Sequence, residues 1–257
     1  MNKIVDQPDL YDLLYEDVTE DIYMYLNLLK GQKNILEFGA GTGRVTIPLA
    51  KDGHFIEAVD LSSKMLNKMK NKIQNDETLR EHINPVLANM CGYLSTKKFN
   101  AILIPLTSFN YLLTEQEQEQ CLLAIKNNLL DNGFAIVELL SKKTFLDTNS
   151  SDDFTFIKRI GVNDRSYYDY YRKTTLDLEN RKIYQRRLFK YYENGKYISE
   201  EELEWKNRFV TIEDFETVAT KVELEIEKVY GNCNLDAYNP DSEDVFIKIR
   251  RKKIVCQ

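Results

Sequence analysis

Three glycines at alternate positions are the clearest chemical signal in the chain. They are Gly39, Gly41 and Gly43, within the stretch Asn34 to Arg44 that reads NILEFGAGTGR. An apolar run precedes them and a helix-like run follows, which is the order strand, glycine loop, helix. Glycine tolerates a positive φ, and its missing side chain lets backbone amides come close to a ligand. The stretch therefore predicts a cradle for a nucleotide-type ligand.

The spacing of the glycines narrows the choice of ligand. A dinucleotide fingerprint needs a further glycine where Arg44 or Thr46 stands, depending on the register, and a phosphate-binding P-loop needs Gly-Lys-Ser/Thr after the glycines. Neither pattern is present. What remains is an acidic residue, Glu37, at the end of the strand, followed by glycines at every second position.

A second carboxylate closes the next apolar segment. The run His54 to Asp60 alternates as a strand does, and Asp60 lies about 20 residues beyond the first glycine, where an acidic residue that binds ribose hydroxyls is expected in such βαβ units. An amphipathic helix follows, with Met65 and Ile73 on its apolar side.

These two segments resemble the first motifs of the class I S-adenosylmethionine-dependent methyltransferases. The resemblance covers roughly residues 9–139 and the last two strands. It implies S-adenosyl-L-methionine as the cofactor and S-adenosyl-L-homocysteine as its product. It also implies a set of cofactor-binding residues, which are Tyr11, Tyr15, Glu37, Gly39, Ala40, Gly41, Thr42, Gly43, Asp60, Leu61, Met65, Asn89, Met90 and Leu106.

The resemblance assigns roles to some of these residues. Asp60 would bind both ribose hydroxyls, Leu61 would pack on adenine, and the backbone near Leu106 would take the amino group of the cofactor. Asn89 and Met90 would border the edge of adenine. Asn89 stands where the family commonly has an acidic residue, and its side-chain oxygen can still accept a hydrogen bond.

An aromatic pair near the N-terminus allows two interpretations. Tyr11 and Tyr15 are spaced i, i+4 and would share one face of a helix. The rings could pack on the core. In the resembling family, a tyrosine in such a segment often closes over the methionine end of the cofactor.

The elements that must position these residues alternate between strand and helix. Five such strands, the last from Phe134 to Leu139, predict a doubly wound α/β sheet. Two more strands, Val222 to Tyr230 and Asp244 to Arg251, would bring the sheet to seven, with the final strand antiparallel as in the resembling fold. Residues 1–141 and 212–257 are therefore expected to form the methyltransferase core.

Residues 142–211 follow a different pattern, predicted to be an antiparallel β insertion that forms a substrate lid. Eight of the sixteen tyrosines fall within 167–197. Their simplest role is cross-strand aromatic packing. Alternatively, an aromatic face of the lid shapes the acceptor pocket, and Tyr184 is then a candidate substrate-binding residue.

Two further segments are candidates for contact with the acceptor. The loop that carries Phe109 and Asn110 follows the fourth strand, so it should face the reactive methyl at the carboxyl ends of the strands. Asp164 and Arg165 are the candidate catalytic pair, because a carboxylate can hold an amine and a guanidinium can bind a carbonyl or carboxylate. The same pair is also typical of a simple polar turn.

Composition argues against several other functions. The net charge is −6 and the isoelectric point about 5.2, so no basic excess is available for nucleic acid. Four scattered cysteines and two histidines make a metal site unexpected. The segment Met1 to Pro8 lacks an apolar signal region, and no run approaches the ~20 apolar residues of a membrane span. These features favour a cytoplasmic protein without a membrane partner, and they leave its oligomeric state open.

Two narrower resemblances suggest the acceptor. The segment Tyr11 to Tyr15 and the insertion look like the N,N-dimethyltransferases of aminosugar biosynthesis. The Asp164–Arg165 pair ahead of a tyrosine-rich strand looks like the N-terminal amine methyltransferases of azole-modified peptides, the plantazolicin type. The hypothesis is an N-methyltransferase of a natural-product amine, with a modified peptide slightly preferred over a small molecule. A non-catalytic cofactor-binding regulatory protein is the alternative, and a nicotinamide oxidoreductase lacks its glycine fingerprint.

Overall fold

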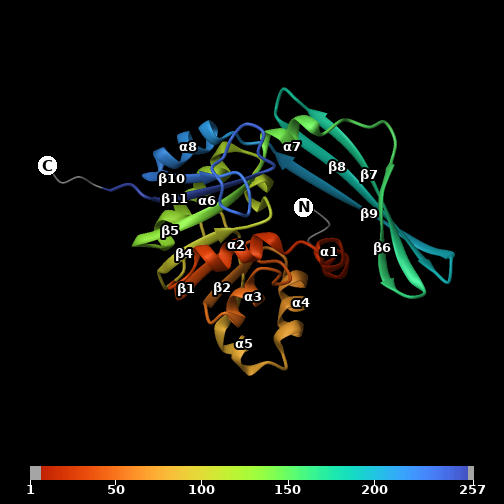
Figure 1. Cartoon of the computed structure of the whole chain (residues 1–257), viewed down its shortest axis with the longest axis horizontal. Coiled ribbons are helices and arrows are strands. Elements are labelled where there is room, and N and C mark those ends of the chain that lie inside the picture. The colour runs from red at the N-terminus through yellow and green to blue at the C-terminus, as the bar shows by residue number, and fades with distance from the viewer. Residues whose placement is uncertain (1–6, 254–257) are drawn as a thin grey trace.

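The computed structural model describes residues 7–253 of the chain. Residues 1–6, which include most of the segment expected to lack a signal region, lie outside this part, as does Cys256. Figure 1 shows the described elements as two sheets: a core of strands and helices, and a long four-stranded sheet that extends from one side of it.

The core sheet has seven strands in the order β10-β11-β5-β4-β1-β2-β3. Their bounds are β1 Asn34–Phe38, β2 Phe55–Asp60, β3 Ile83–Leu87, β4 Phe99–Ile104, β5 Leu129–Leu140, β10 Leu224–Tyr230 and β11 Asp244–Arg251. Strands β1 to β5 are parallel, whereas β11 is antiparallel to β5 and β10. This confirms the predicted doubly wound sheet with an antiparallel last strand. The strand order reverses between β1 and β4, which places a crevice at their carboxyl ends.

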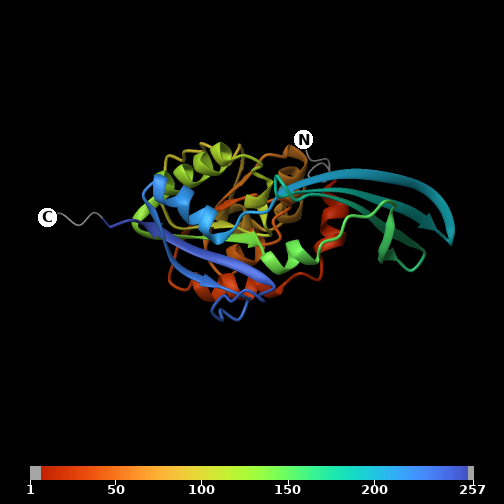
Figure 2. The ribbon, with the colours of Figure 1, turned by 90° about the horizontal axis from the view of Figure 1, so that it is seen from above.

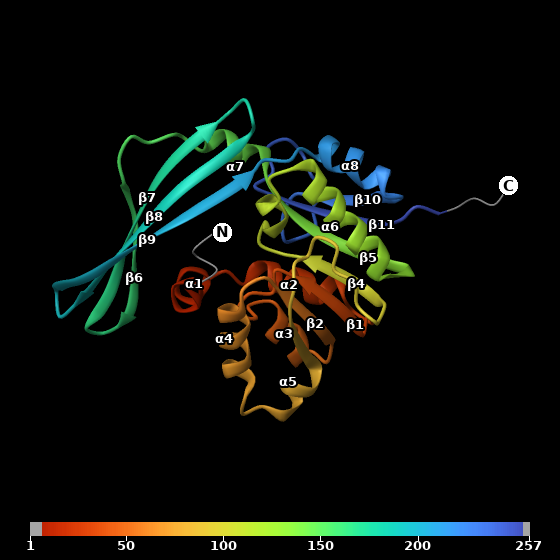
Figure 3. The same ribbon diagram turned by 180° about the vertical axis from the view of Figure 1, so that it is seen from behind.

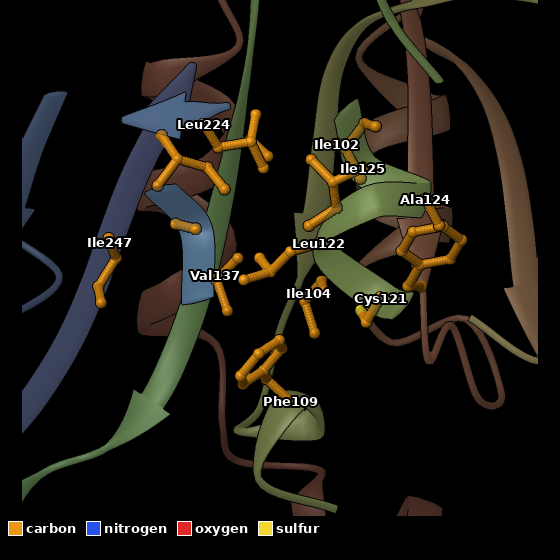
Figure 4. Packing of buried hydrophobic residues seen from close by; sticks show 14 of the residues in the cluster. Ile102, Ile104, Phe109, Cys121, Leu122, Ala124, Ile125, Val137, Leu224 and Ile247 are labelled. Atoms are coloured by element: carbon orange, nitrogen blue, oxygen red, sulfur yellow. The ribbon is translucent and has the colours of Figure 1, made fainter. Parts of the chain in front are cut away.

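Helices cover both faces of the core sheet (Figure 2). They are α2 Glu20–Leu28, α3 Thr46–Lys51, α4 Ser63–Ile73 and α5 Glu77–His82 on one face, and α6 Glu115–Asn128 and α8 Ile212–Lys221 on the other. Successive side chains of a strand point to opposite faces. Ile35 therefore packs in the cluster under α2 to α5, and Leu36 packs in the cluster under α6 and α8. Figure 4 shows Ile104 and Val137 beside Leu122 of α6 in the second cluster.

The second sheet lies between β5 and α8 in the sequence and has the order β6-β7-β8-β9. A short helix, α7 Lys142–Asp147, leads into β6 Thr155–Asn163, β7 Ser166–Asp177, β8 Lys182–Glu193 and β9 Lys196–Arg208. All its neighbouring strands are antiparallel. Strand β6 is a largely exposed edge strand that has no clear apolar alternation. We call residues 142–211 the insertion.

The two faces of the insertion sheet differ in chemistry. The inner face carries Tyr170, Phe189 and Trp205, which pack with helix α1 (Pro8–Tyr15). Figure 3 shows α1 between this sheet and the core. The outer face carries ion pairs such as that of Arg186 with Glu202. Cross-strand rings stack as the tyrosine pattern favoured, with ring centroids 4.8 Å apart for Tyr170 and Phe189.

A single buried side chain contacts the backbone at both ends of the insertion. Asn110 lies in η2 (Ser108–Tyr111), a short 3₁₀ helix after β4. Its Oδ1 accepts a hydrogen bond from the Leu140 amide at 2.9 Å, and its Nδ2 donates to the Arg208 carbonyl at 2.8 Å. Leu140 ends β5 and Arg208 ends β9. Asn110 therefore fixes the two points at which the chain enters and leaves the insertion.

The predicted substrate roles of Phe109 and Asn110 are not supported by these positions. Phe109 is fully buried and packs against Phe215 of α8, with ring centroids 5.3 Å apart. The tight turn of η2 directs both side chains into the protein, so the neighbouring Ser108 and Tyr111 line the cleft instead. Phe109 and Asn110 are structural residues.

The variant Asn110→Ala should lower the free energy of unfolding by about 2–6 kcal/mol. The reason is that the Leu140 amide and the Arg208 carbonyl would lose their partners, and each unpaired buried group costs about 1–3 kcal/mol. Urea unfolding followed by circular dichroism measures the change. The matched control is Asn127→Ala in the exposed last turn of α6, for which we expect a change within about 0.5 kcal/mol. Similar values for the two variants would show that the Asn110 side chain does not hold the two ends of the insertion.

Candidate functional site

A cleft of about 460 Å³ lies at the carboxyl ends of the core strands. Such a volume is typical of a small-molecule site. The glycine loop after β1, the end of β2, and the loops after β3 and β4 form its floor, while α1 and β9 contribute its outer wall. Of the predicted cofactor residues, the cleft is lined by Tyr11, Gly39, Gly41, Asp60, Leu61, Met65, Asn89, Met90 and Leu106.

Positive φ values shape the glycine loop. They are +72° at Gly39, +56° at Gly41 and +87° at Gly43. A Cβ at Gly39 would lie 2.8 Å from Ser108 Oγ, and one at Gly43 would lie 2.9 Å from Met69 Cγ. Gly39 thus allows the loop to approach η2, and Gly43 allows it to approach α4. At Gly41 the nearest atoms belong to the Tyr11 ring, 3.8 Å away, so this tyrosine covers the loop.

Asp60 connects the glycine loop to the end of β2. Its Oδ2 accepts a hydrogen bond from the Gly41 amide at 2.8 Å, and its Oδ1 accepts one from the Ser62 amide at 2.8 Å. The residue is 8% exposed, and burial raises the pKa of its carboxyl group. A carboxylate has about four lone-pair positions, so Asp60 retains capacity to accept hydrogen bonds from hydroxyl groups in the cleft.

The far end of the cleft is mainly apolar. Met65, in the first turn of α4, is buried, and Leu61 is exposed beside it. Met90 follows β3, and so does Asn89, whose Oδ1 accepts a hydrogen bond from the Cys91 amide at 2.9 Å. These side chains form two walls that can hold a flat ring, with the Asn89 amide group at its edge.

Five other predicted cofactor residues do not line the cleft: Tyr15, Glu37, Ala40, Thr42 and Gly43. They support the residues that do. Thr42 Oγ1 donates to Asp12 Oδ1 at 2.5 Å and so fastens α1 to the loop. The Tyr15 ring packs beside Tyr11, with centroids 4.9 Å apart. Of the two interpretations of the tyrosine pair, Tyr11 covers the cleft and Tyr15 packs on the inner face of the insertion.

Two buried carboxyl groups lie beneath the loops. Glu37 accepts a hydrogen bond from Thr46 Oγ1 at 2.6 Å, and burial raises its pKa to about 8. Glu138 accepts one from the Leu106 amide at 2.7 Å, and burial likewise raises its pKa to about 8. Leu106 and Thr107 have φ values of +50° and +53°, which are strained for residues with a Cβ. Glu138, which sequence reasoning did not single out, holds this strained turn at the edge of the cleft.

Aromatic rings border the side of the cleft nearest the insertion. Tyr111 of η2 and Trp205 of β9 stack with ring centroids 5.6 Å apart and an interplanar angle of 29°. Sequence reasoning missed both. The available signal was that Trp205 is the only tryptophan of the chain and lies in a strand otherwise rich in charge.

Asp164 and Arg165, the predicted catalytic pair, lie away from the cleft. They form the turn between β6 and β7, and the Arg165 carbonyl accepts a hydrogen bond from the Asn194 amide at 2.7 Å. Asn194 is in the β8–β9 turn. Strand β9 begins at Lys196, nine residues before Trp205, and nine residues span about 30 Å along a strand. The placement gives no support to a catalytic role and fits the polar turn that was its alternative.

Tyr184, the predicted substrate residue of the insertion, does not line the cleft either. Its ring lies 5.9 Å from Lys206 Nζ. Since side chains alternate along β8, Tyr184 points to the face opposite Ile183 and Phe189, which are buried on the inner face. Period-two alternation could have shown this once the inner face was known.

Neither a metal site nor a membrane span is found in the described part. Among residues 7–253, no group of three or more His, Cys, Asp or Glu side chains could hold a metal ion. Within the same residues, no helix has the length and apolar character needed to cross a membrane.

Comparison with known proteins agrees with this geometry. The model of the methyltransferase domain family matches residues 35–133. A putative methyltransferase of a Geobacillus species is 25% identical over 222 residues, which cover 86% of each chain.

Two solved structures share the fold. A methyltransferase from Clostridium acetobutylicum, described as S-adenosylmethionine-dependent, superposes with a TM-score of 0.80 at 18% identity and covers 95% of this chain and 97% of that one. The sugar N-methyltransferase KedS8 from a Streptoalloteichus species gives a TM-score of 0.72 at 16% identity, over 94% and 93% of the two chains.

Replacing Gly39 by Ala should destabilise the protein more than replacing Gly31. Both have a positive φ, +72° and +80°, which costs about 1–2 kcal/mol for a residue with a Cβ. Nothing lies within 4 Å of a Cβ at Gly31, whereas one at Gly39 meets Ser108 Oγ. We expect urea unfolding to show a loss of about 1–2 kcal/mol for Gly31→Ala and a larger loss for Gly39→Ala.

A double variant separates the collision from the backbone strain at Gly39. Adding Ser108→Gly removes the atoms in the way and leaves the positive φ unchanged. Relative to Ser108→Gly alone, Gly39→Ala should then cost no more than Gly31→Ala does. An undiminished cost in the double variant would mean that close approach to η2 is not the reason for this glycine.

The stability of the protein should depend on pH through Glu37. Its pKa is raised from the ordinary value of 4.5 to about 8 in the folded state, so the folded protein binds this proton more tightly than the unfolded chain does. The resulting stabilisation is complete below about pH 4.5 and is lost as the pH rises towards 8. Urea unfolding at pH 5 and pH 8 should show a smaller decline for Glu37→Gln than for the unaltered protein. An equal decline for the two proteins would contradict the raised pKa of Glu37.

Proposed function

We propose that this chain, which is a class I S-adenosylmethionine-dependent methyltransferase, methylates an amine nitrogen of a small natural-product acceptor. The observation that carries the proposal is one continuous cleft. Its inner part has the glycine loop and Asp60, and its outer part ends on Tyr111 and Trp205 of η2 and the insertion.

The residues of the inner cleft fit the cofactor. Gly39 and Gly41 leave the backbone of the loop open, and Asp60 retains lone pairs for the two ribose hydroxyls. Leu61 and Met65 offer apolar surface to adenine. When bound, S-adenosylmethionine supplies a methyl group that its sulfonium makes electrophilic. Tyr11 covers the loop and helps to exclude water.

The remaining task of the chain is to position the acceptor. An amine that attacks a methyl group needs its lone pair free and aligned, and holding two reactants in that geometry supplies much of the rate enhancement of such transfers. Tyr111 and Trp205 can hold an acceptor at the mouth of the cleft and keep it dry. We therefore propose that residues 1–141 and 212–257 bind the cofactor and that the insertion, 142–211, holds the acceptor.

Two features favour nitrogen as the methylated atom and a small molecule as the acceptor. KedS8, a sugar N-methyltransferase, has a similar fold over 94% of this chain and 93% of its own. The azole-modified peptide, slightly preferred from the sequence, depended on Asp164 and Arg165, which lie at the distal turn of the insertion. A small amine is therefore the first choice of acceptor, and an azole-modified peptide becomes the second.

A labelled-cofactor assay tests the proposed reaction. The purified protein is incubated with methyl-labelled S-adenosylmethionine and a panel of amino sugars, peptides with a free N-terminus, alcohols and activated carbon acids. We expect label in an amino sugar, with mass spectrometry placing the added methyl on nitrogen. Label only on carbon or oxygen would overturn the proposal, as would cofactor binding without transfer to any acceptor.

The variant Asp60→Asn should weaken cofactor binding at least about tenfold. It removes the charge that strengthens hydrogen bonds to the ribose hydroxyls, and a hydrogen bond to a charged group contributes about 1.5–3 kcal/mol. Isothermal titration calorimetry measures the affinity, and circular dichroism verifies the fold. The matched control is Asp17→Asn at an exposed position near α2, for which the affinity should not change. Equal affinities for both variants would exclude the assigned role of Asp60.

A further inference from the structure

We propose that Arg172 and Arg187 form an oxyanion site on the inner face of the insertion, and that the acceptor carries a phosphate or carboxylate group which binds there. The part concerning the acceptor rests on the proposed function. The anion site itself rests only on the geometry of the insertion sheet.

The two arginines are direct neighbours across the strands. In the register of β7 with β8, Arg172 is paired with Arg187. Side chains at paired positions project from the same face, with Cβ atoms about 5 Å apart. The pair lies between the cluster of Tyr170 and Phe189, which α1 covers, and a second cluster that contains Ile183. Both arginines are partly buried.

Neither guanidinium has a carboxylate partner in the described part of the chain. Other arginines of the insertion do, since Arg159 pairs with Asp169 at 2.7 Å and Arg186 pairs with Glu202. Arg187 instead donates from Nε and Nη2 to Gln185 Oε1, at 3.2 and 2.8 Å. Arg172 interacts with the Tyr170 side chain.

Two paired arginines without a carboxylate between them are costly without a ligand. Like charges at directly paired positions destabilise a sheet. A bound oxyanion would remove that repulsion, and guanidinium groups bind phosphate and carboxylate through paired, charge-assisted hydrogen bonds. The arrangement is thus more easily understood as a binding site than as a stabilising contact.

Trp205 connects the arginine pair to the methyl-transfer cleft. The Arg187 Cζ lies 3.4 Å from the centroid of the Trp205 ring. The same indole lines the cleft and stacks with Tyr111. An acceptor could therefore place its amine in the cleft while its anionic group reaches past the indole to Arg187.

Arg172 lies near groups that can bind an anion and near others that repel one. It lines a groove of about 690 Å³ beneath α7, together with hydroxyl groups such as those of Thr144 and Thr174 that can donate to an anion. Three carboxylates line the same groove: Asp147, Glu243 and Asp244. Glu243 is paired with Lys143 at 2.7 Å. The carboxylates disfavour an anion elsewhere in the groove, so the favourable position is next to the arginine pair.

Titration with simple anions tests the site without knowledge of the acceptor. Inorganic phosphate, pyrophosphate and acetate are titrated at constant ionic strength, with affinity measured by calorimetry. Fluorescence of Trp205, the only tryptophan, reports whether the anion lies beside Arg187. We expect saturable binding with a fluorescence change. Preference for phosphate or pyrophosphate would identify a phosphorylated acceptor, and preference for acetate a carboxylated one.

Three variants locate the site. Arg172→Gln and Arg187→Gln should each weaken anion binding about tenfold or more, while Arg186→Gln, one residue along β8 on the outer face, should leave it unchanged. All three should bind S-adenosylmethionine as the unaltered protein does, because the glycine loop and Asp60 are untouched. Absence of saturable binding, or equal weakening by Arg186→Gln, would overturn the inference even if methyl transfer is found. Anion binding without methyl transfer would uphold the site and refute only the proposed function.

Discussion

The hydrogen bond from the Gly41 amide to the Asp60 carboxylate is the contact on which the cleft depends. It ties the loop after β1 to the end of β2, so two strand ends act as one surface. The other Asp60 oxygen accepts from the Ser62 amide, which also fixes the start of α4 and hence Met65. Because one buried carboxylate holds both the loop and the helix, its position determines the shape of the entire inner cleft. The positive φ values of the glycines are the backbone conformations that this closure requires.

Beneath that surface, the protein buries more acidic groups than it neutralises. Arg44 makes a two-pronged ion pair with Asp21, and this pair joins the end of the glycine loop to α2. Glu37 and Glu138 have no basic partner at ion-pair distance in the described part, and burial raises the pKa of each to about 8. Both accept hydrogen bonds from groups that shape the cleft, Thr46 and the Leu106 amide. Their burial is therefore understandable as positioning, since a carboxyl group in a dry site holds a donor in a well-defined direction.

Local sequence patterns were enough to predict the core, but not the part of the cleft that is proposed to hold the acceptor. The glycine spacing, Asp60 and the strand–helix alternation predicted the fold and the floor of the cleft, because those residues are close in sequence and act through backbone geometry. Tyr111 and Trp205 meet across more than ninety positions, which only the folded insertion brings together. Phe109 and Asn110 were misassigned because η2 turns them inward, and Tyr184 because the face of its strand was unknown. Asp164 and Arg165 had suitable chemistry but lie at a distal turn.

The clasp at Asn110 has an evolutionary consequence. Both chain crossings between core and insertion pass this one amide, at Leu140 and at Arg208, so the chain enters and leaves the insertion at neighbouring points. An insertion whose two ends lie together can be exchanged for another of different length and sequence while the parts that hold the cofactor stay intact. Exchange of the insertion alone can then change the acceptor without changes to the core, provided that the new sheet again has an aromatic ring that stacks on Tyr111.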